Sequence, residues 1–248
     1  KMAINWIETE IIEHKRWTEV LASLKFKGNV LPYTAGQFTK VGLEIDGEMI
    51  SRPYSYVSSP SEDFLEIVYV MVPDGKLTPA LSGLSVGDKL FAMEKASGFF
   101  VMSEVPDGDD LWMLATGTGV GVFISLLKTS EPWDRFKNIV LVHGVRAVDE
   151  LTYKDQIDEF STKYGDRFTY IPTITREKKD NCLNLRIPAG LKDNKFQEIA
   201  NLEITNKTQV MICGNPDMIN DTVSLLEKSG LERNRRSKPG NITLEKYW

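Results

Sequence analysis

The chain has 248 residues, 42% of them hydrophobic and 26% charged, and its 30 basic and 35 acidic side chains give a net charge of −5. Such a chain is an ordinary globular protein of one or two domains, and its acidic balance argues against duplex nucleic acid as the main partner. Two cysteines and two histidines are too few for a disulfide framework or a Cys- or His-rich metal centre, so we expect no bound metal.

No stretch has the character of an export signal or a membrane span. Glu8 and Glu10 lie where a signal peptide would need an apolar core. The longest uncharged stretch, 111–127, is interrupted by a glycine-rich turn and is better interpreted as a strand, a turn and a helix. We therefore expect a soluble protein of the cytoplasm that does not enter a membrane.

Residues up to about 103 have the alternating or β-rich pattern of short strands. We predict these strands over 10–12, 18–24, 38–43, 64–72 and 89–92. Turn signals separate them, namely Lys27-Gly28-Asn29, Asp46-Gly47, Pro73-Asp74-Gly75 and Gly87-Asp88. Several strands at this spacing indicate a closed or sandwiched antiparallel sheet.

One short helix is predicted between the last two of these strands. Thr78 is a favourable N-cap, Pro79 suits the first helical position, and Gly83 would end the helix near Leu84. Because Gly75 opens the backbone and a helix start attracts phosphate, these residues suit a phosphate-binding turn. A simple helix cap without a ligand accounts for them equally well.

A change of pattern near residue 106 indicates two domains. Pro106-Asp107-Gly108-Asp109-Asp110 contains no apolar residue and is typical of a boundary. After it, predicted strands at 111–115, 138–143, 168–172 and 209–213 alternate with predicted helices at 121–128, 151–163, 193–200 and 216–228. Such alternation is typical of a parallel sheet with right-handed crossovers. We therefore predict domains over 1–105 and 106–248.

A glycine turn follows the first strand of the second domain. The strand 111–115 leads into Thr116-Gly117-Thr118-Gly119-Val120-Gly121, after which a helix begins. Glycines allow close backbone approach, and a helix N-terminus offers unpaired N–H groups to a pyrophosphate, as in dinucleotide-binding folds. The string is not a full GxGxxG, so a tight turn without a ligand is the alternative.

Cations stand where an NAD-binding fold would carry an acidic residue for the ribose 2′-hydroxyl. The second strand runs into His143-Gly144-Val145-Arg146, Arg176 follows the third strand, and Arg186 comes later. Guanidinium groups can bind a phosphate through two hydrogen bonds at once. Each arginine alone is explained by surface solvation, but the three together favour NADP over NAD.

Five motifs occur in the order in which one enzyme family carries them. They are Arg52-Pro53-Tyr54-Ser55, Gly75-Lys76-Leu77-Thr78, Gly117-Thr118-Gly119, Cys213-Gly214-Asn215-Pro216 and Glu245-Lys246-Tyr247-Trp248. On these motifs nearly the whole chain resembles the bacterial ferredoxin/flavodoxin–NADP reductases of the short subclass that ends in Tyr-Trp. The resemblance implies an antiparallel β-barrel domain that binds FAD, followed by a Rossmann-like α/β domain with a parallel sheet that binds NADP(H).

The resemblance implies an FAD site in the first domain and at the C-terminal tail. Arg52 would pair with the FAD pyrophosphate, Tyr54 would lie against the flavin, and Ser55 would reach the N5 region that receives hydride. The further FAD contacts that it implies are Pro53, Val68, Tyr69, Val70, Gly75, Lys76, Leu77, Thr78, Tyr247 and Trp248. A polar turn with a packed tyrosine is the alternative for 52–55, and docking on the protein core is the alternative for the final aromatics.

The resemblance also implies an NADP(H) site in the second domain. Its contacts would be Gly117, Thr118, Gly119, Val145, Arg146, Thr175, Arg176, Arg186, Cys213, Gly214, Pro216 and Asp217. Ser55, Cys213 and Glu245 would line the hydride path as catalytic residues. Nothing nearby in the sequence suggests an activated thiolate at Cys213, for which a buried small hydrophobic residue is the alternative interpretation.

The activity implied is hydride transfer between NADP(H) and FAD, with single electrons passing between FAD and ferredoxin or flavodoxin, in a monomeric enzyme. A reductase component of a monooxygenase, another NADPH–flavin diaphorase and a flavin-binding regulator without turnover are the alternatives. Because the chain has no iron–sulfur cysteine cluster, the carrier must be a separate protein. The basic cluster of Arg233, Arg235, Arg236 and Lys238 is a solvated face or a docking site for an acidic carrier.

Overall fold

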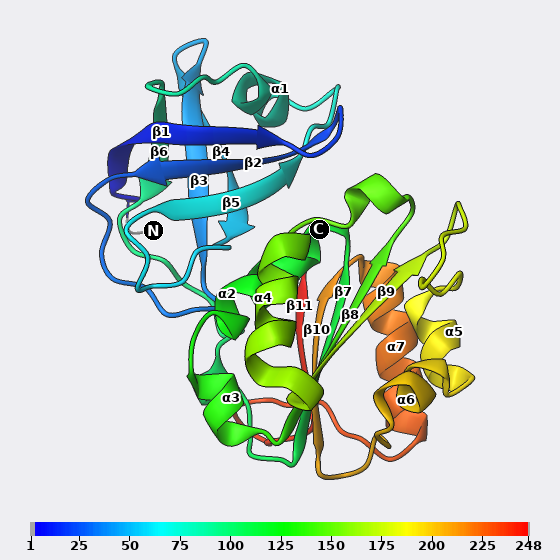
Figure 1. Cartoon of the computed structure of the whole chain (residues 1–248). Coiled ribbons are helices and arrows are strands. Elements are labelled where there is room, and N and C mark those ends of the chain that lie inside the picture. The colour runs from blue at the N-terminus through cyan, green and yellow to red at the C-terminus, as the bar shows by residue number, and fades with distance from the viewer. Residues whose placement is uncertain (1–2, 248) are drawn as a thin grey trace. The chain divides into compact units, whose positions relative to one another are not determined.

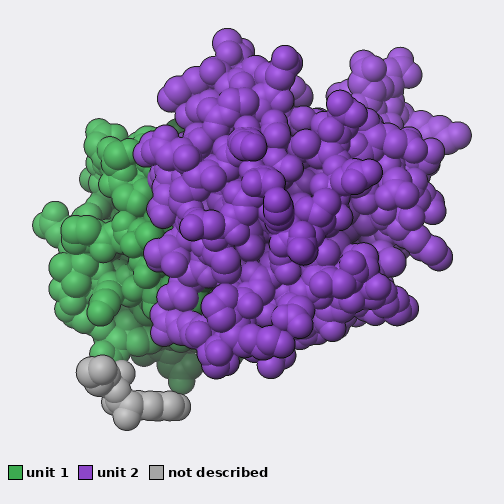
Figure 2. Space-filling model, turned by 90° about the horizontal axis from the view of Figure 1, so that it is seen from below, with its two compact units in different colours: residues 1–101 green, residues 102–248 purple. Residues whose placement is uncertain are grey.

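The computed structural model describes residues 3–247 and divides the chain into two compact units, residues 1–101 and 102–248 (Figure 2). The division falls just before the domain boundary that the sequence suggests at 105/106. Each unit has its own sheet and its own apolar core (Figure 1). Within residues 3–247, no helix has the length and apolar composition that crossing a membrane requires.

The first unit is built on a curled antiparallel sheet of six strands. They are β1 (Trp6–Arg16), β2 (Leu21–Lys27), β3 (Phe38–Ile45), β4 (Glu48–Ser55), β5 (Leu65–Val70) and β6 (Lys89–Met93). Their order is β4-β3-β6-β1-β2-β5. The two ends of the sheet approach each other just after β4, where the Val57 N–H donates to the Glu66 carbonyl of β5 at 2.8 Å. The expected antiparallel β domain is confirmed.

Strand β4 was missing from the sequence prediction, although the turn before it was included. Asp46 and Gly47 have φ of 52° and 82°, and Ile45 pairs with Glu48 across them. Positive φ at both central residues is typical of two-residue hairpins. Because β4 lies at the sheet edge, it tolerates Pro53 within the strand, and this polar, proline-containing strand shows no clear alternation. The motif 52–55 therefore lies on an edge strand.

The short helix α1 (Leu77–Ser82) lies between β5 and β6, but its predicted N-cap was wrong. The N-cap is Lys76, and Thr78 lies within the first turn of the helix. The Thr78 hydroxyl instead accepts the Val72 N–H at 2.8 Å and so closes the exposed turn 73–75. The helix ends at Gly83, as predicted.

The second unit contains a five-stranded parallel sheet in the order β11-β10-β7-β8-β9. Its strands are β7 (Asp110–Thr116), β8 (Asn138–Val145), β9 (Phe168–Ile174), β10 (Thr208–Gly214) and β11 (Ile242–Lys246). Its helices are α2 (Val120–Leu127), α3 (Glu131–Arg135), α4 (Lys154–Tyr164), α5 (Ile187–Lys192), α6 (Lys195–Ala200) and α7 (Pro216–Lys228). The helices α2 to α4 cover one face and α5 to α7 the other (Figure 1), which confirms the expected α/β domain.

Three short elements of this unit, α3, α5 and β11, were missing from the sequence prediction. Each is only five or six residues long, so an apolar period has no room to repeat. The predicted helix 193–200 also begins later, because Asn194 adopts a left-handed conformation with φ of 56° between α5 and α6. The longer strands and the helix α7 lie close to where the sequence placed them.

Candidate functional site

The strand order reverses between β7 and β10. In open parallel sheets, ligands bind outside the carboxyl ends of the strands at such a point. Here the two carboxyl ends are bonded together, because the Asn215 N–H donates to the Thr116 hydroxyl at 2.9 Å. A Cβ on Gly119 would lie 2.5 Å from the Cys213 carbonyl oxygen, so the glycine turn rests directly on the end of β10. The fold thus brings two of the predicted motifs together.

A buried histidine supports the glycine turn. Residues Gly117–Gly119 form a single 3₁₀ turn, and Gly117 has φ of 55° with open space where a Cβ would stand. His143 of β8 is fully buried, and its Nε2 lies 2.9 Å from the Gly117 carbonyl oxygen. Burial lowers the pKa of His143 to about 4, so at neutral pH the ring is uncharged and Nε2–H is the donor. No role for His143 was predicted from the sequence.

Three predicted residues meet at the carboxyl ends of β10 and β11. The parallel ladder pairs Cys213 with Glu245, and the Tyr247 N–H donates to the Gly214 carbonyl at 3.3 Å. Burial raises the pKa of the Cys213 thiol well above its ordinary value, the nearby Glu245 carboxylate raises it further, and a hydrogen bond with Tyr247 opposes them. Cys213 is therefore a small neutral group rather than a nucleophile. Trp248 lies outside the described residues.

Arg146 and Arg176 are neighbours at the carboxyl ends of β8 and β9. The ladder between these strands continues past their ends, because the Thr175 N–H donates to the Val145 carbonyl at 3.1 Å. The next bond joins the Arg176 N–H to the Arg146 carbonyl at 2.9 Å. Two exposed arginines thus lie side by side at the same edge of the sheet.

Arg186 lies at the same edge of the sheet. The segment before it returns alongside β9, where the Ile174 N–H donates to the Leu183 carbonyl at 2.8 Å, and Arg186 is then the N-cap of α5. Like Arg146 and Arg176, it is exposed, and none of these arginines forms an ion pair with another described residue. Three uncompensated cations at one sheet edge can receive a multiply charged anion such as a phosphate.

Asn215 has two structural roles that the sequence analysis missed. Besides its bond to Thr116, its Oδ1 accepts the Asp217 N–H at 2.8 Å and caps α7. The dipeptide Asn215-Pro216 was the available signal, since Asn is a preferred N-cap and Pro a preferred first helical residue. The Asn215 side chain therefore uses the Asp217 N–H, and Pro216 is the first residue of α7. The helix begins directly after β10, where the strand order of the sheet reverses.

The first unit carries an arginine and a tyrosine on one face of β4. Arg52 and Tyr54 are two positions apart, so their side chains project the same way. The exposed Arg52 donates to the Ser51 carbonyl at 2.7 Å, and Tyr54 is half-buried against the apolar core. Burial raises the pKa of Tyr54 to about 12 despite the nearby Arg52, so its phenol is neutral. Pro53 is exposed and Ser55 is buried.

The three predicted contacts on β5 differ in what they present. The side chains of Val68 and Tyr69 are buried, whereas Val70 is 44% exposed. The Tyr69 hydroxyl lies 2.8 Å from Nε2 of His14, whose Nδ1 lies 2.7 Å from the Leu84 carbonyl oxygen. Tyr69 is thus bonded within the protein, and Val70 is the residue of this group whose side chain reaches solvent.

The predicted phosphate turn is an exposed loop on a buried anchor. Gly75 and Lys76 are exposed, whereas the side chains of Leu77 and Thr78 are buried. The Gly75 N–H donates to the Val72 carbonyl at 2.9 Å. What remains for a ligand is the Lys76 cation and the unpaired N–H groups of the first turn of α1.

The basic cluster at 233–238 is largely neutralised. Arg233 pairs with Glu227 at 2.9 Å, Arg236 with Glu104 at 2.8 Å and Lys238 with Glu232 at 3.3 Å. Arg235 forms no ion pair with any residue that the structure describes. It is therefore the cluster's one cation without a charged partner among these residues.

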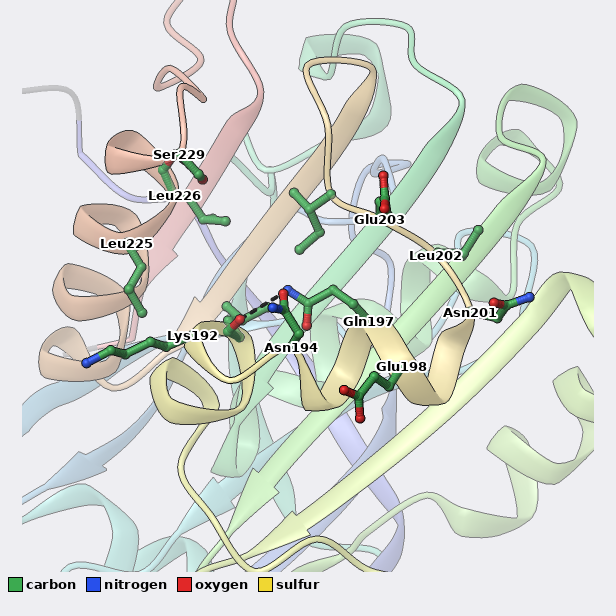
Figure 3. Close-up of a pocket in the computed structure, with 12 residues that line it drawn as sticks. Lys192, Asn194, Gln197, Glu198, Asn201, Leu202, Glu203, Leu225, Leu226 and Ser229 are labelled. Carbon is green, nitrogen blue, oxygen red and sulfur yellow. Dashed lines mark hydrogen bonds between the residues drawn. The ribbon is translucent and has the colours of Figure 1, made fainter.

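A cavity of about 640 Å³ lies in the second unit between α5, α6 and α7 (Figure 3). Leucines and Ile204 form its apolar wall, and Lys192, Glu198 and Glu203 are among its polar lining residues. None of the predicted site residues lines it. Among residues 3–247, no three His, Cys, Asp or Glu side chains gather where they could hold a metal ion.

Comparison with known proteins identifies two domain families in the chain. A model described as oxidoreductase FAD-binding domain matches residues 8–98, and one described as oxidoreductase NAD-binding domain matches residues 113–224. The flavodoxin/ferredoxin–NADP reductase of Shigella flexneri is 43% identical to this chain, and that of Escherichia coli K12 is 42% identical. Each alignment covers 98% of this chain and 99% of the relative.

A solved structure is similar over the same extent. The crystal structure of a ferredoxin NADP⁺ reductase from Neisseria gonorrhoeae, with bound FAD and NADP, superposes with a TM-score of 0.94 at 32% sequence identity. The match covers 99% of this chain and 100% of that one.

Proposed function

This chain belongs to the flavodoxin/ferredoxin–NADP reductase family, and we propose that it transfers hydride between NADP(H) and FAD and single electrons between FAD and ferredoxin or flavodoxin. The family that the five motifs suggested is thereby confirmed. The structural observation that carries the proposal is the position of Arg146 and Arg176, which a backbone hydrogen bond holds side by side at the carboxyl edge of the parallel sheet.

We propose that residues 1–105 bind FAD and residues 106–248 bind NADP(H), with the C-terminal tail returning to the flavin. The domain families matched at 8–98 and 113–224 support this division. The Neisseria gonorrhoeae reductase, which is similar over its whole length, holds both nucleotides.

The side chains on β4 and beside α1 fit a flavin dinucleotide. Arg52 is an exposed cation for the pyrophosphate, and the neutral ring of Tyr54 offers an aromatic surface next to it. Lys76 and the first turn of α1 supply further donors beside the exposed Gly75, and Val70 supplies an exposed apolar contact. FAD, when bound, supplies the redox chemistry, and the chain positions it. Pro53, Ser55, Val68, Tyr69, Leu77, Thr78 and Tyr247 are proposed to complete the site.

The switch point of the parallel sheet fits NADP(H). Gly117, whose carbonyl is bonded to His143, has open space where a Cβ would stand, and this suits close approach of a pyrophosphate. Thr118 and Gly119 continue the turn. Arg146, Arg176 and Arg186 match the charge of a 2′-phosphate. Val145, Thr175, Gly214, Pro216 and Asp217 are proposed as the surrounding contacts.

We propose that Ser55, Cys213 and Glu245 line the hydride path. Cys213 is a small, neutral and fully buried group at the end of β10, so a larger side chain there would project toward the proposed nicotinamide position and block the ring. Glu245, its partner in the β-ladder, places a carboxylate near a ring whose oxidised form is positively charged. No residue of the chain is required to act as a nucleophile.

Anaerobic mixing of the FAD-loaded protein with NADPH tests the proposal. We expect rapid loss of the oxidised-flavin absorption, and then faster reoxidation by flavodoxin or ferredoxin than by unrelated acceptors. Absence of bleaching would support a flavin-binding regulator instead. Bleaching with no preference for either carrier would support a monooxygenase reductase component or another diaphorase.

The finer proposals are that the enzyme is a monomer and acts in the cytoplasm with a separate carrier protein. The names of the relatives support flavodoxin or ferredoxin as that carrier. Sedimentation of the purified protein tests the first proposal, and cell fractionation tests the second.

A further inference from the structure

A carboxylate joins two of the arginine-bearing loops. Glu177 directly follows Arg176, and its Oε1 accepts the backbone N–H of Val148, two residues after Arg146. The same loops share the bond from the Arg176 N–H to the Arg146 carbonyl at 2.9 Å. Beyond the bonds that Thr175 makes to the Val145 carbonyl, one backbone bond and the Glu177 side-chain bond span the two loops, and the side-chain bond depends on a single residue.

An amide joins the third arginine-bearing segment to the same place. Asn184 lies two residues before Arg186, and its Nδ2 donates to the Ile174 carbonyl at 2.7 Å and to the Glu177 carbonyl at 2.9 Å. These bonds close the base of the loop 175–183. They also hold the backbone of Glu177, whose side chain holds Val148. We name Glu177 and Asn184 the loop clasp.

The charge of Glu177 is unfavourable where it stands. An exposed carboxylate next to Arg176 reduces the attraction that a phosphate would feel there. A carboxylate is, however, a stronger acceptor for a backbone N–H than a neutral oxygen is. Its contact with Val148 indicates that its role is to position the loops.

We propose that the loop clasp positions Arg146, Arg176 and Arg186 for a ligand carrying a 2′-phosphate, and so contributes to selectivity for NADP(H) over NAD(H). The inference rests on the proposed NADP(H) site. Glu177 and Asn184 act through the arginines and need not touch the nucleotide. Guanidinium groups that must converge on one phosphate lose affinity when their loops move apart, whereas a nucleotide without that phosphate is insensitive to the movement.

The test measures binding of 2′,5′-ADP and of ADP to the FAD-loaded protein by calorimetry. We expect Glu177→Ala and Asn184→Ala each to weaken 2′,5′-ADP by about three- to tenfold, with ADP unchanged. Glu177→Gln, which keeps the acceptor oxygen without the charge, should restore most of the affinity. The double variant should lose less than the product of the single losses, because both residues hold one loop.

Asp180→Ala is the matched control, since it also removes an exposed carboxylate from the loop 175–183. The Asp180 carboxylate has no hydrogen-bond partner among the described residues. The variant should not weaken 2′,5′-ADP. Flavin content and far-UV circular dichroism report whether each variant is folded.

Three outcomes would contradict the proposed role of the loop clasp. They are tighter or unchanged binding of 2′,5′-ADP by Glu177→Ala, equal weakening of both ligands, and loss of affinity in Glu177→Gln equal to that in Glu177→Ala. Arg176→Ala separates this failure from failure of the proposed site. If Arg176→Ala weakens 2′,5′-ADP and Glu177→Ala does not, the site stands without the clasp. If neither does, the site itself is wrong.

Discussion

Nε2 of His143 lies 2.9 Å from the carbonyl oxygen of Gly117, so a buried, uncharged ring on β8 holds the first residue of the turn that follows β7. A side chain from one strand thereby fixes the backbone at the end of its neighbour. This relationship makes the stability of the second unit depend on the protonation of one imidazole.

The stability of the protein should therefore fall in acid through His143. Its pKa is lowered by burial from 6.5 to about 4, so between these values the unfolded chain binds a proton that the folded chain does not. The contribution of His143 to the free energy of unfolding is complete above its unfolded pKa. As the pH falls from there toward 4, the free energy of unfolding decreases by on the order of 3 kcal/mol. Denaturant unfolding of the wild type and of His143→Gln, which keeps an N–H donor and does not titrate, should diverge in pH dependence. Identical profiles would show that His143 is not the group responsible.

The three arginines at the sheet edge should discriminate between the two nicotinamide nucleotides. Arg146→Ala and Arg176→Ala should each raise KM for NADPH by about ten- to a hundredfold and leave KM for NADH little changed, because only NADPH carries the 2′-phosphate. Steady-state kinetics with an artificial acceptor measures this. Arg235→Ala, which removes an exposed cation elsewhere on the unit, should change neither value. Equal effects on NADPH and NADH would refute the 2′-phosphate assignment.

The close contact between the glycine turn and β10 should make Gly119 sensitive to substitution. In Gly119→Ala, the new methyl group would lie 2.5 Å from the backbone oxygen of Cys213, so the turn must move away from the strand. We expect the free energy of unfolding to fall by about 3 kcal/mol. Gly117→Ala meets open space and carries only its backbone strain, for which we expect about 1 kcal/mol. Denaturant unfolding compares them, and equal losses would contradict the steric argument.

The two cysteines should react differently with alkylating reagents. The Cys213 thiol is fully buried, and burial raises its pKa, whereas Cys182 is partly exposed. Iodoacetamide should therefore modify Cys182 in the native protein and leave Cys213 unmodified until the protein is unfolded. Mass spectrometry of the digested protein identifies the labelled site. Rapid native labelling of Cys213 would mean that its thiol is open to solvent.

The basic cluster tests how the electron carrier docks. Arg235→Glu should slow reduction of an acidic carrier and weaken the dependence of that rate on salt, because Arg235 has no ion-pair partner among the described residues. Arg236→Glu should do the same but also lose its 2.8 Å pair with Glu104. Stopped-flow reoxidation by flavodoxin at several ionic strengths measures both. Unchanged carrier kinetics in Arg235→Glu would exclude this surface.

Much of the fold could be predicted because its signals are local. The apolar run 111–115 and the glycines after it are properties of neighbouring residues, and they located β7 and the turn that follows it. The edge strand β4 was not predicted because a largely exposed strand with polar and proline residues lacks a clear apolar period, and β11 was not predicted because it is only five residues long.

The sequence by itself determined the order of elements, the family motifs and the excess of arginine where an acidic residue was expected. Only the tertiary structure decided which of these residues meet. It placed Cys213 beside Glu245, Gly119 on the end of β10 and Glu177 against Val148, and it buried Tyr69 within the first unit. Each contact joins residues far apart in the chain through the order and register of the strands. Hydrophobic periodicity specifies which face of a strand is buried, but it does not specify which strand lies next to it.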